Sequence, residues 1–370
     1  MSELKKEFDV LVAGHICLDI IPQFDPHCRY TAASFSPGKL INVGAPLISS
    51  GGPVANTGLS LYRLGAAVDL RGLLGTDSFG QNLLQILKKE NPILAAGMLE
   101  DANVTTSYSL VLSPPGLDRT FFHCPGANDS FEARHIDYSR VRNAKIFHFG
   151  YPSVMQKMYQ NDGNGLVEVM RKAKEAGAVT SLDTTFPDQE SPGGKANWQK
   201  IFKSTLPWVD VFLPSIEEIL IMLFPEKYRT FGGKILEKIT MDDLHYVASR
   251  LIEMGVKIVV LKLGNRGVYL ETAGPEKMRE MSALLTDTGL WSNCRIHQRC
   301  YEAKVIGTTG AGDAAIAGFL YGLAKGVSPK KAVQMASAVG ACNVEAPDAI
   351  SGIRSWGEIK KRIQNGWKEA

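Results

Sequence analysis

The chain has 370 residues, and its 41 basic and 38 acidic side chains leave a formal net charge of only +3. This near balance, without a run of Lys or Arg, argues against binding to nucleic acid, and no apolar stretch approaches the ~18 residues that span a membrane. With 45% hydrophobic residues, six scattered cysteines and a charged amino terminus, the sequence predicts a cytoplasmic protein with reduced thiols and a sizeable core.

Apolar runs alternate with amphipathic stretches along most of the chain. The runs expected as strands cover residues 8–13, 68–74, 145–149, 179–183, 210–213 and 257–263, and the stretches expected as helices cover 54–64, 80–90, 163–177 and 241–255. Most of the strand runs are almost continuously hydrophobic, as in strands that are buried on both faces. The pattern predicts an α/β fold with a doubly wound, mostly parallel sheet flanked by helices.

Two segments, 20–50 and 105–124, interrupt this alternation. The first is rich in Pro, Gly and Ser, and it contains no clear amphipathic helix. The second has two β-prone runs, 107–112 and 119–123, around the residues Ser-Pro-Pro-Gly. Such a pair of runs around a turn sequence predicts a β-hairpin without an attached helix.

A glycine-rich turn, Gly310-Ala311-Gly312, comes before Asp313 and an apolar helix. Glycines let backbone N–H groups approach a ligand, and the unpaired N–H groups in the first turn of a helix favour an anion such as phosphate. Because a carboxylate repels phosphate, Asp313 is better suited to act as a base toward a hydroxyl. A simple helix cap is the plain alternative, and a dinucleotide site needs an acidic residue ~20 positions later, whereas none lies between Asp313 and Glu345.

A second glycine cluster contains Gly51 and Gly52, followed by Asn56. Together with the Gly-Ala-Gly-Asp turn it resembles the two signature regions of the ribokinase-like (PfkB) carbohydrate kinases, and the resemblance extends from about residue 10 to about residue 343. It implies that Asp19, Gly51, Gly52 and Asn56 bind sugar hydroxyls. It also implies that the backbone of the turn forms an anion hole for the γ-phosphate of ATP and that Asp313 is the catalytic base.

Shorter matches extend the resemblance. The run Gly-Ala-Asn that ends at Asn128 looks like the family segment after the lid strands, which makes Asn128 a further candidate for the sugar site. Residues 261–268 look like the nucleotide-side strand and turn. The resemblance thus implies five contacts to ATP, made by Lys262, Gly264, Gly267, Thr309 and Asn343.

The sequence departs from the family pattern at two places. The family's Asn-x-x-Glu motif, which is tied to the metal and the phosphates, here begins with Ser215 and ends with Glu218, so Glu218 is the expected Mg²⁺ residue. Gly307 stands where the family often has an Asp that helps to bind a monovalent cation, which makes potassium activation doubtful. Plain alternatives exist for three residues: an exposed Lys262, a solvated Glu218 on a helix, and an Asp19 that caps a turn.

The resemblance also implies a division into domains. Segments 20–50 and 105–124 would form a small β-sheet lid over the sugar, and residues 1–19, 51–104 and 125–370 would form the α/β domain that binds nucleotide and substrate. Closing such a lid excludes water, which otherwise accepts the phosphoryl group. Exposed lid edges in such kinases can pair between subunits, so a homodimer through the lid is expected.

The sequence therefore predicts an ATP- and Mg²⁺-dependent kinase that acts on a small-molecule sugar or sugar-like hydroxyl. Two alternatives stay open: a nucleoside kinase of the same fold, and a catalytically silent sugar-binding member. Three histidines, His15, His27 and His123, are candidates for the pocket. The spacing of Cys294, His297 and Cys300 suits no common zinc module. The extra segments 187–200, 225–240 and 273–299 have no assigned role.

Overall fold

The largest element of the fold is a nine-stranded sheet with the strand order β13-β12-β11-β10-β9-β8-β1-β4-β5. The computed structural model describes residues 6–117 and 119–370, so residues 1–5 of the expected α/β domain and residue 118 of the expected lid lie outside it. The strands of this sheet are β1 Phe8–Gly14, β4 Val68–Gly75, β5 Met98–Asp101, β8 Ala144–Gly150, β9 Val179–Leu182, β10 Val211–Phe212, β11 Ile258–Lys262, β12 Val268–Thr272 and β13 Arg295–Gln298. All neighbours pair in parallel except β11 with β12 and β12 with β13.

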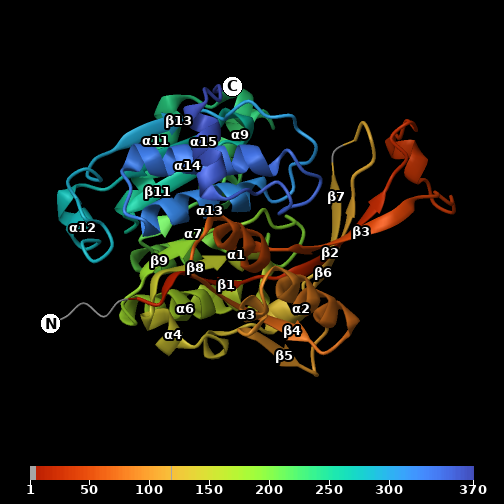
Figure 1. The fold of residues 1–370 in the computed structure, drawn as a ribbon, viewed down its shortest axis with the longest axis horizontal. Coiled ribbons are helices and arrows are strands. Elements are labelled where there is room, and N and C mark those ends of the chain that lie inside the picture. Colours follow the sequence, from red (N-terminus) through yellow and green to blue (C-terminus); the bar gives the residue numbers. More distant parts are fainter. Residues whose placement is uncertain (1–5, 118) are drawn as a thin grey trace.

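Helices cover both faces of this sheet (Figure 1). In β1, Val10 and Val12 belong to one apolar core, and Leu11 and Ala13 belong to the other, as expected for a central strand whose side chains alternate between two covered faces. The helices of the first core are α1 Pro53–Leu64, α2 Ser78–Glu90, α3 Pro92–Ala95, α12 Pro275–Arg279, α13 Ala311–Ala324, α14 Pro329–Asn343 and α15 Trp356–Gln364. The helices of the second core are α4 Tyr138–Arg142, α5 Gln156–Tyr159, α6 Asn164–Glu175, α7 Trp198–Thr205, α8 Ile216–Leu223, α9 Pro225–Phe231, α10 Ile235–Lys238 and α11 Met241–Glu253.

The expected elements are confirmed with shifts of at most two residues at their ends. The sequence pattern did not predict the edge strands β5 and β13, the strand β12 next to β13, or the helix α14. The strand β13 is mostly exposed or half-buried, and α14 is rich in Ala and buried along most of its length. Neither element therefore has the strong apolar period on which sequence patterns depend.

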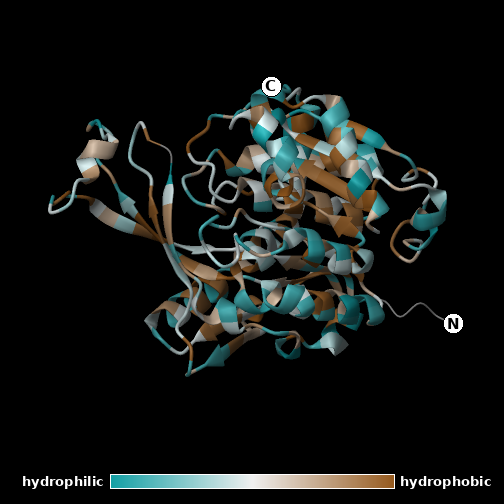
Figure 2. Ribbon diagram, turned by 180° about the vertical axis from the view of Figure 1, so that it is seen from behind, coloured by the Kyte–Doolittle hydropathy of each residue, from teal (hydrophilic) through white to brown (hydrophobic). Residues whose placement is uncertain are grey.

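A second, four-stranded sheet with the order β3-β2-β6-β7 projects from one side of the body (Figures 1 and 2). Its strands are β2 Cys17–Gln23, β3 Gly44–Gly51, β6 Tyr108–Leu112 and β7 Thr120–Cys124. The segments expected as a lid supply most of this sheet, including the predicted hairpin, which is β6 and β7. The sheet leaves several large apolar side chains exposed, namely Ile48, Phe121 and Phe122.

Two of the extra segments are structured. Residues 225–240 form α9 and α10, and the guanidinium of Arg266 donates to the carbonyl oxygens of Leu236 and Ile239 at 2.9 and 2.8 Å, which ties this segment to the turn after β11. Residues 273–299 include α12 and β13. Among the helices that the structure describes, none is long and apolar enough to cross a membrane.

Candidate active site

The predicted anion turn forms the start of α13. Gly310 precedes the helix with φ 73°, and a Cβ at this position would lie 2.5 Å from the Cβ of Ala349, so only glycine fits there without a shift. The N–H of Ala311 donates to the carbonyl oxygen of Thr308 at 3.3 Å. A Cβ on Gly312 would lie 3.6 Å from the Lys262 ammonium nitrogen. The turn therefore faces a cation, which is the electrostatic setting that an anion requires.

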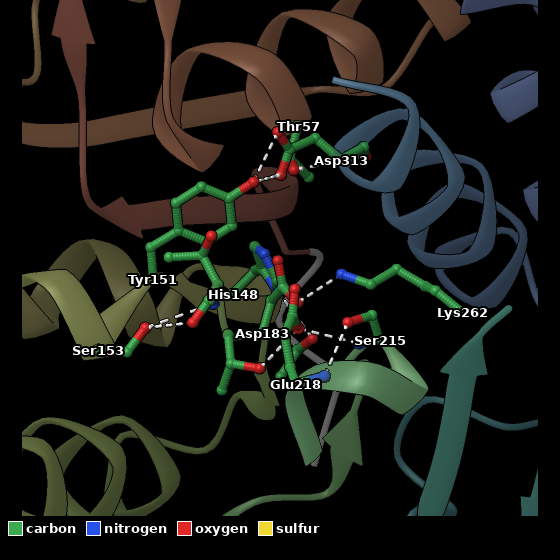
Figure 3. A network of polar contacts seen from close by, with 12 residues as sticks. Thr57, His148, Tyr151, Ser153, Asp183, Ser215, Glu218, Lys262 and Asp313 are labelled. Carbon is green, nitrogen blue, oxygen red and sulfur yellow. Dashed lines mark hydrogen bonds and ion pairs between the residues drawn. The ribbon is translucent and has the colours of Figure 1, made fainter. Parts of the chain in front are cut away.

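Asp313 lies in the first turn of α13 and is almost completely buried. The Asn56 amide donates to its Oδ2 at 2.9 Å, and the Tyr151 hydroxyl lies 3.0 and 3.1 Å from its two carboxylate oxygens (Figure 3). Burial raises the pKa of Asp313, although the hydrogen bonds and the Lys262 charge oppose this. A carboxylate with a raised pKa that is held by donors has the properties of a general base.

The residues predicted for the sugar lie beside Asp313. Asp19 is a buried residue of β2, and a Cβ on Gly51 would lie 2.5 Å from an oxygen of its carboxylate. Gly52 caps α1 with φ 81°, and Asn56 in the first turns of this helix joins the group to Asp313. Burial raises the pKa of Asp19 to about 6, and the charge of Asp313 adds to this shift. Asp19 thus lies within a strand, and it does not cap a turn.

Asn128 lies next to this group but is fully buried. Its side-chain amide donates to the carbonyl oxygen of Ile16 at 3.0 Å and its Oδ1 accepts from the Ile16 N–H at 3.2 Å. Both ends of the amide are therefore engaged with the two-residue link between β1 and β2. In this structure Asn128 holds the backbone that carries Asp19 in place.

Two of the three candidate histidines, His15 and His123, contact each other near the residues that were predicted to bind the sugar. The Nε2 atoms of His15 and His123 are 3.3 Å apart, and His123 Nδ1 is 3.0 Å from the Ser109 hydroxyl of β6. Burial lowers the pKa of both histidines, so one neutral ring donates to the other. His27 is exposed in the lid and does not join them.

A second polar group lies on the other side of the anion turn, where β9, β10 and β11 end. The Lys262 ammonium donates to Asp183 at 2.8 Å, and both side chains are largely buried (Figure 3). Burial raises the pKa of Asp183 while Lys262 opposes the shift. Burial also disfavours the charged form of Lys262, but the neighbouring carboxylates raise its pKa overall. The exposed alternative for Lys262 is therefore wrong.

Glu218 belongs to this second group. Ser215 caps α8, the Ser215 N–H donates to the Glu218 carboxylate at 2.9 Å, and the Thr184 hydroxyl donates to the same oxygen at 3.0 Å. Glu218 also lines a cavity of about 310 Å³ together with Phe186, Ser215, Glu217, Tyr228, Gly233 and Ile235. The residue predicted for the metal thus borders an open space.

The remaining predicted ATP residues are spread around this region. Gly264 and Gly267 flank the turn after β11 with φ values of 55° and 93°. The lid residue Arg119 donates to the Thr309 hydroxyl at 2.5 Å, which joins the lid hairpin to the anion turn. Asn343 is buried at the end of α14 and donates to the carbonyl oxygen of Ala349 at 2.7 Å. The Asn343 side chain therefore supports the segment that packs against Gly310.

Sequence reasoning missed two residues that the structure places at the centre of the site, Tyr151 and Asp183. Asp183 ends a buried run that was assigned as a strand, and in parallel sheets ligands bind at the carboxyl ends of strands, so this position was a signal. Tyr151 carries no comparable signal. No group of three or more His, Cys, Asp or Glu side chains in the described ranges is arranged to hold a metal ion, and this includes the region of Cys294, His297 and Cys300.

The mostly parallel sheet, its covering helices and the four-stranded lid define a ribokinase-like enzyme fold. The ribokinase of Arabidopsis thaliana complexed with ribose and ATP has this fold, with a TM-score of 0.73, 20% identity, and coverage of 96% of this chain and 98% of that one. The model of the pfkB family carbohydrate kinases matches residues 9–356. The chain belongs to this family and is a carbohydrate kinase.

Two sequence relatives agree with this assignment. An uncharacterized sugar kinase of Archaeoglobus fulgidus is 28% identical over 295 residues, which cover 80% of this chain and 98% of that protein. The probable fructokinase-6, chloroplastic, of Arabidopsis thaliana is 27% identical over 353 residues, which cover 93% of this chain and 79% of that protein.

Proposed function

We propose that the protein transfers the γ-phosphoryl group of ATP to a hydroxyl of a sugar, with Asp313 as the general base. The observation that carries the proposal is the position of Asp313. Its carboxylate lies at the start of α13, in contact with Asn56 on the sugar side, and the Lys262 ammonium faces the adjacent Gly312. One carboxylate therefore borders both an acceptor site and an anion site, as phosphoryl transfer requires.

The acceptor side has the chemistry that a polyol needs. Asp19 and Asn56 offer an acceptor and a donor for neighbouring hydroxyls. Gly51 leaves the Asp19 carboxylate uncovered, because any side chain at that position would collide with it. The relatives named as sugar kinase, fructokinase and ribokinase support a sugar as the acceptor. The Asp313 carboxylate would accept the proton of the attacking hydroxyl.

The phosphate side fits ATP with Mg²⁺. Asp183 Oδ2 is buried without a hydrogen-bond partner among the described residues, and Glu218 lies nearby. Mg²⁺ usually binds one or two carboxylates and completes its coordination with phosphates and water, so Asp183 and Glu218 would hold it. The bound ion would neutralise charge on the phosphates, while Lys262 and the backbone of the anion turn attract the group that is transferred.

Other expectations stay predictions. The position of Gly307 against the carbonyl oxygens of Ala346 and Pro347 offers no side-chain ligand, and this supports the expectation that potassium activation is doubtful. The exposed apolar residues of the lid support a homodimer through that sheet. A cytoplasmic location also stays a prediction.

The proposal is tested by measuring ADP release from Mg·ATP with a panel of sugars, sugar acids, polyols and nucleosides. We expect turnover with at least one sugar or polyol. Asp313→Asn should lower kcat by a factor of ~10² or more, the usual contribution of a positioned base, and leave ATP binding nearly intact. Asp242→Asn, an exposed site on α11, is the matched control. Near wild-type turnover of Asp313→Asn would contradict the assignment of the base, and turnover of nucleosides alone would contradict the sugar assignment.

A further inference from the structure

Tyr151 follows β8 in an unusual backbone conformation. Its φ and ψ are 62° and 44°, in the left-handed region that bulky residues rarely adopt. The residues around it are tightly held. A Cβ on Gly150 would lie 2.3 Å from the ring of Pro53 at the start of α1, and Pro152 begins a helical turn in which the Val154 N–H donates to the Tyr151 carbonyl at 3.2 Å. Neighbouring structure therefore imposes this conformation.

The conformation directs the ring toward the proposed base. The Tyr151 hydroxyl lies 3.0 Å from Asp313 Oδ1 and 3.1 Å from Oδ2, and Figure 3 shows the ring pointing toward Asp313. The centroid of the Tyr151 ring is also 5.9 Å from that of the His15 ring. Tyr151, whose backbone is held in an unusual conformation, thus places its hydroxyl almost equally far from the two carboxylate oxygens of Asp313.

We propose that Tyr151 is a positioning residue for phosphoryl transfer, because its hydroxyl fixes the plane of the Asp313 carboxylate relative to the acceptor hydroxyl. This inference rests on the proposed function. Asn56 donates to Oδ2 alone, and the terminal torsion of an Asp side chain is broad, so one donor leaves the carboxylate free to rotate. A second donor placed between both oxygens removes that freedom and holds the base in a reactive geometry.

The same contact affects the protonation of the base. Burial raises the pKa of Asp313, and the Tyr151 hydrogen bond opposes this rise. The ionisable groups whose charges act on the same carboxylate are Lys262, Glu218, Asp19 and Asp183. The pKa of Tyr151 itself is raised by burial and by the charges of Asp313, Asp183 and Glu218, so the phenol stays a neutral donor. Loss of the hydroxyl would therefore raise the pKa of Asp313 further.

The test is Tyr151→Phe, which keeps the ring and removes only the oxygen. We expect kcat to fall by about tenfold or more, because a hydrogen bond to a charged group is lost. The KM for the sugar should change little, and the acid limb of the pH profile of kcat/KM should move to higher pH. Tyr138→Phe is the matched control, since the Tyr138 hydroxyl is also buried but has no hydrogen-bond partner among the described residues. Its kinetics should equal those of the wild type.

Two results would overturn the inference. The first is a Tyr151→Phe variant with unchanged kcat and an unchanged pH profile. The second is a Tyr151→Phe variant with a lower sugar KM and an unchanged kcat, because this would mean that the phenol only competes with the sugar for the Asp313 carboxylate. The titration of Asp313, followed by carbon NMR of labelled aspartates and assigned with Asp313→Asn, gives a readout without turnover. An inactive wild type would count against the proposed function, whereas an unchanged Asp313 titration would count against the role of Tyr151.

Discussion

Two of the buried carboxylates of the site, Asp313 and Asp183, have different surroundings. Asp313 is held by neutral donors, the Asn56 amide and the Tyr151 hydroxyl. Asp183 is held by a cation, the Lys262 ammonium at 2.8 Å. A carboxylate with neutral partners can gain and lose a proton without leaving an unpaired charge, whereas protonation of Asp183, whose pKa is raised by burial, would leave the buried Lys262 ammonium without its counter-ion. The difference separates a half of the site that is suited to proton transfer from a half that is suited to holding phosphate.

The largest effect is expected when the ion pair is broken. Lys262→Met leaves Asp183 buried without its cation, and removal of one partner of a buried pair typically costs roughly 3 kcal/mol in the free energy of unfolding. Urea unfolding measures this cost. Lys145→Met, which breaks a half-exposed pair with Asp9, should cost about 1 kcal/mol or less. The double variant Lys262→Met with Asp183→Leu should regain stability but not turnover. Equal losses for Lys262→Met and Lys145→Met would contradict the contrast between the carboxylates.

A smaller effect should come from one glycine in each half. An Ala side chain at position 51 would press on the Asp19 carboxylate at 2.5 Å, so Gly51→Ala should raise the sugar KM by about tenfold, equivalent to ~1.4 kcal/mol. An Ala at position 312 would lie between the helix start and Lys262, so Gly312→Ala should raise the KM for ATP instead. Initial rates with each substrate varied in turn give both constants. A rise of both constants in both variants would show that the halves are not separable.

The smallest effect concerns pH. Burial raises the pKa of Asp19 to about 6, and its ionised form is the better acceptor for sugar hydroxyls. The sugar KM should therefore rise as the pH falls through this value, by about twofold at pH 6 relative to pH 8, where nearly all of the group is ionised. Asp19→Asn should bind sugar more weakly and lose this dependence. A pH-independent KM in the wild type would show that Asp19 keeps its charge or does not contact the sugar.

Much of the fold could be predicted from the sequence because its signals are local. Continuous apolar runs marked the buried central strands, and the Ser-Pro-Pro-Gly turn marked the β6–β7 hairpin. The antiparallel edge strand β13, which is mostly exposed or half-buried, gave no such signal. Part of the site could also be predicted from the sequence, since Gly310 and Asp313 combine a turn that requires glycine with a charge at the start of a helix.

Other parts of the site depend on which distant segments meet. The sequence does not show that Asp183 and Lys262 end neighbouring parts of the sheet, 79 positions apart in the chain. Nor does it show that a tyrosine adopts a left-handed conformation, because that conformation is imposed by its neighbours. Asn128 was expected at the sugar, but the hydrogen bonds of its side-chain amide are made to the backbone of Ile16, which lies 112 residues earlier. Such roles follow from tertiary structure alone.

The link between β1 and β2 is only two residues long, and β2 is a central strand of the lid sheet. Asp19 therefore belongs to the lid sheet, whereas Asp313 belongs to the body through α13. A sugar that contacts both carboxylates would span the two sheets and draw them together. Binding of the sugar would then narrow the opening through which water reaches the phosphate. Hydrolysis of ATP by water would therefore be lowest when the sugar is bound.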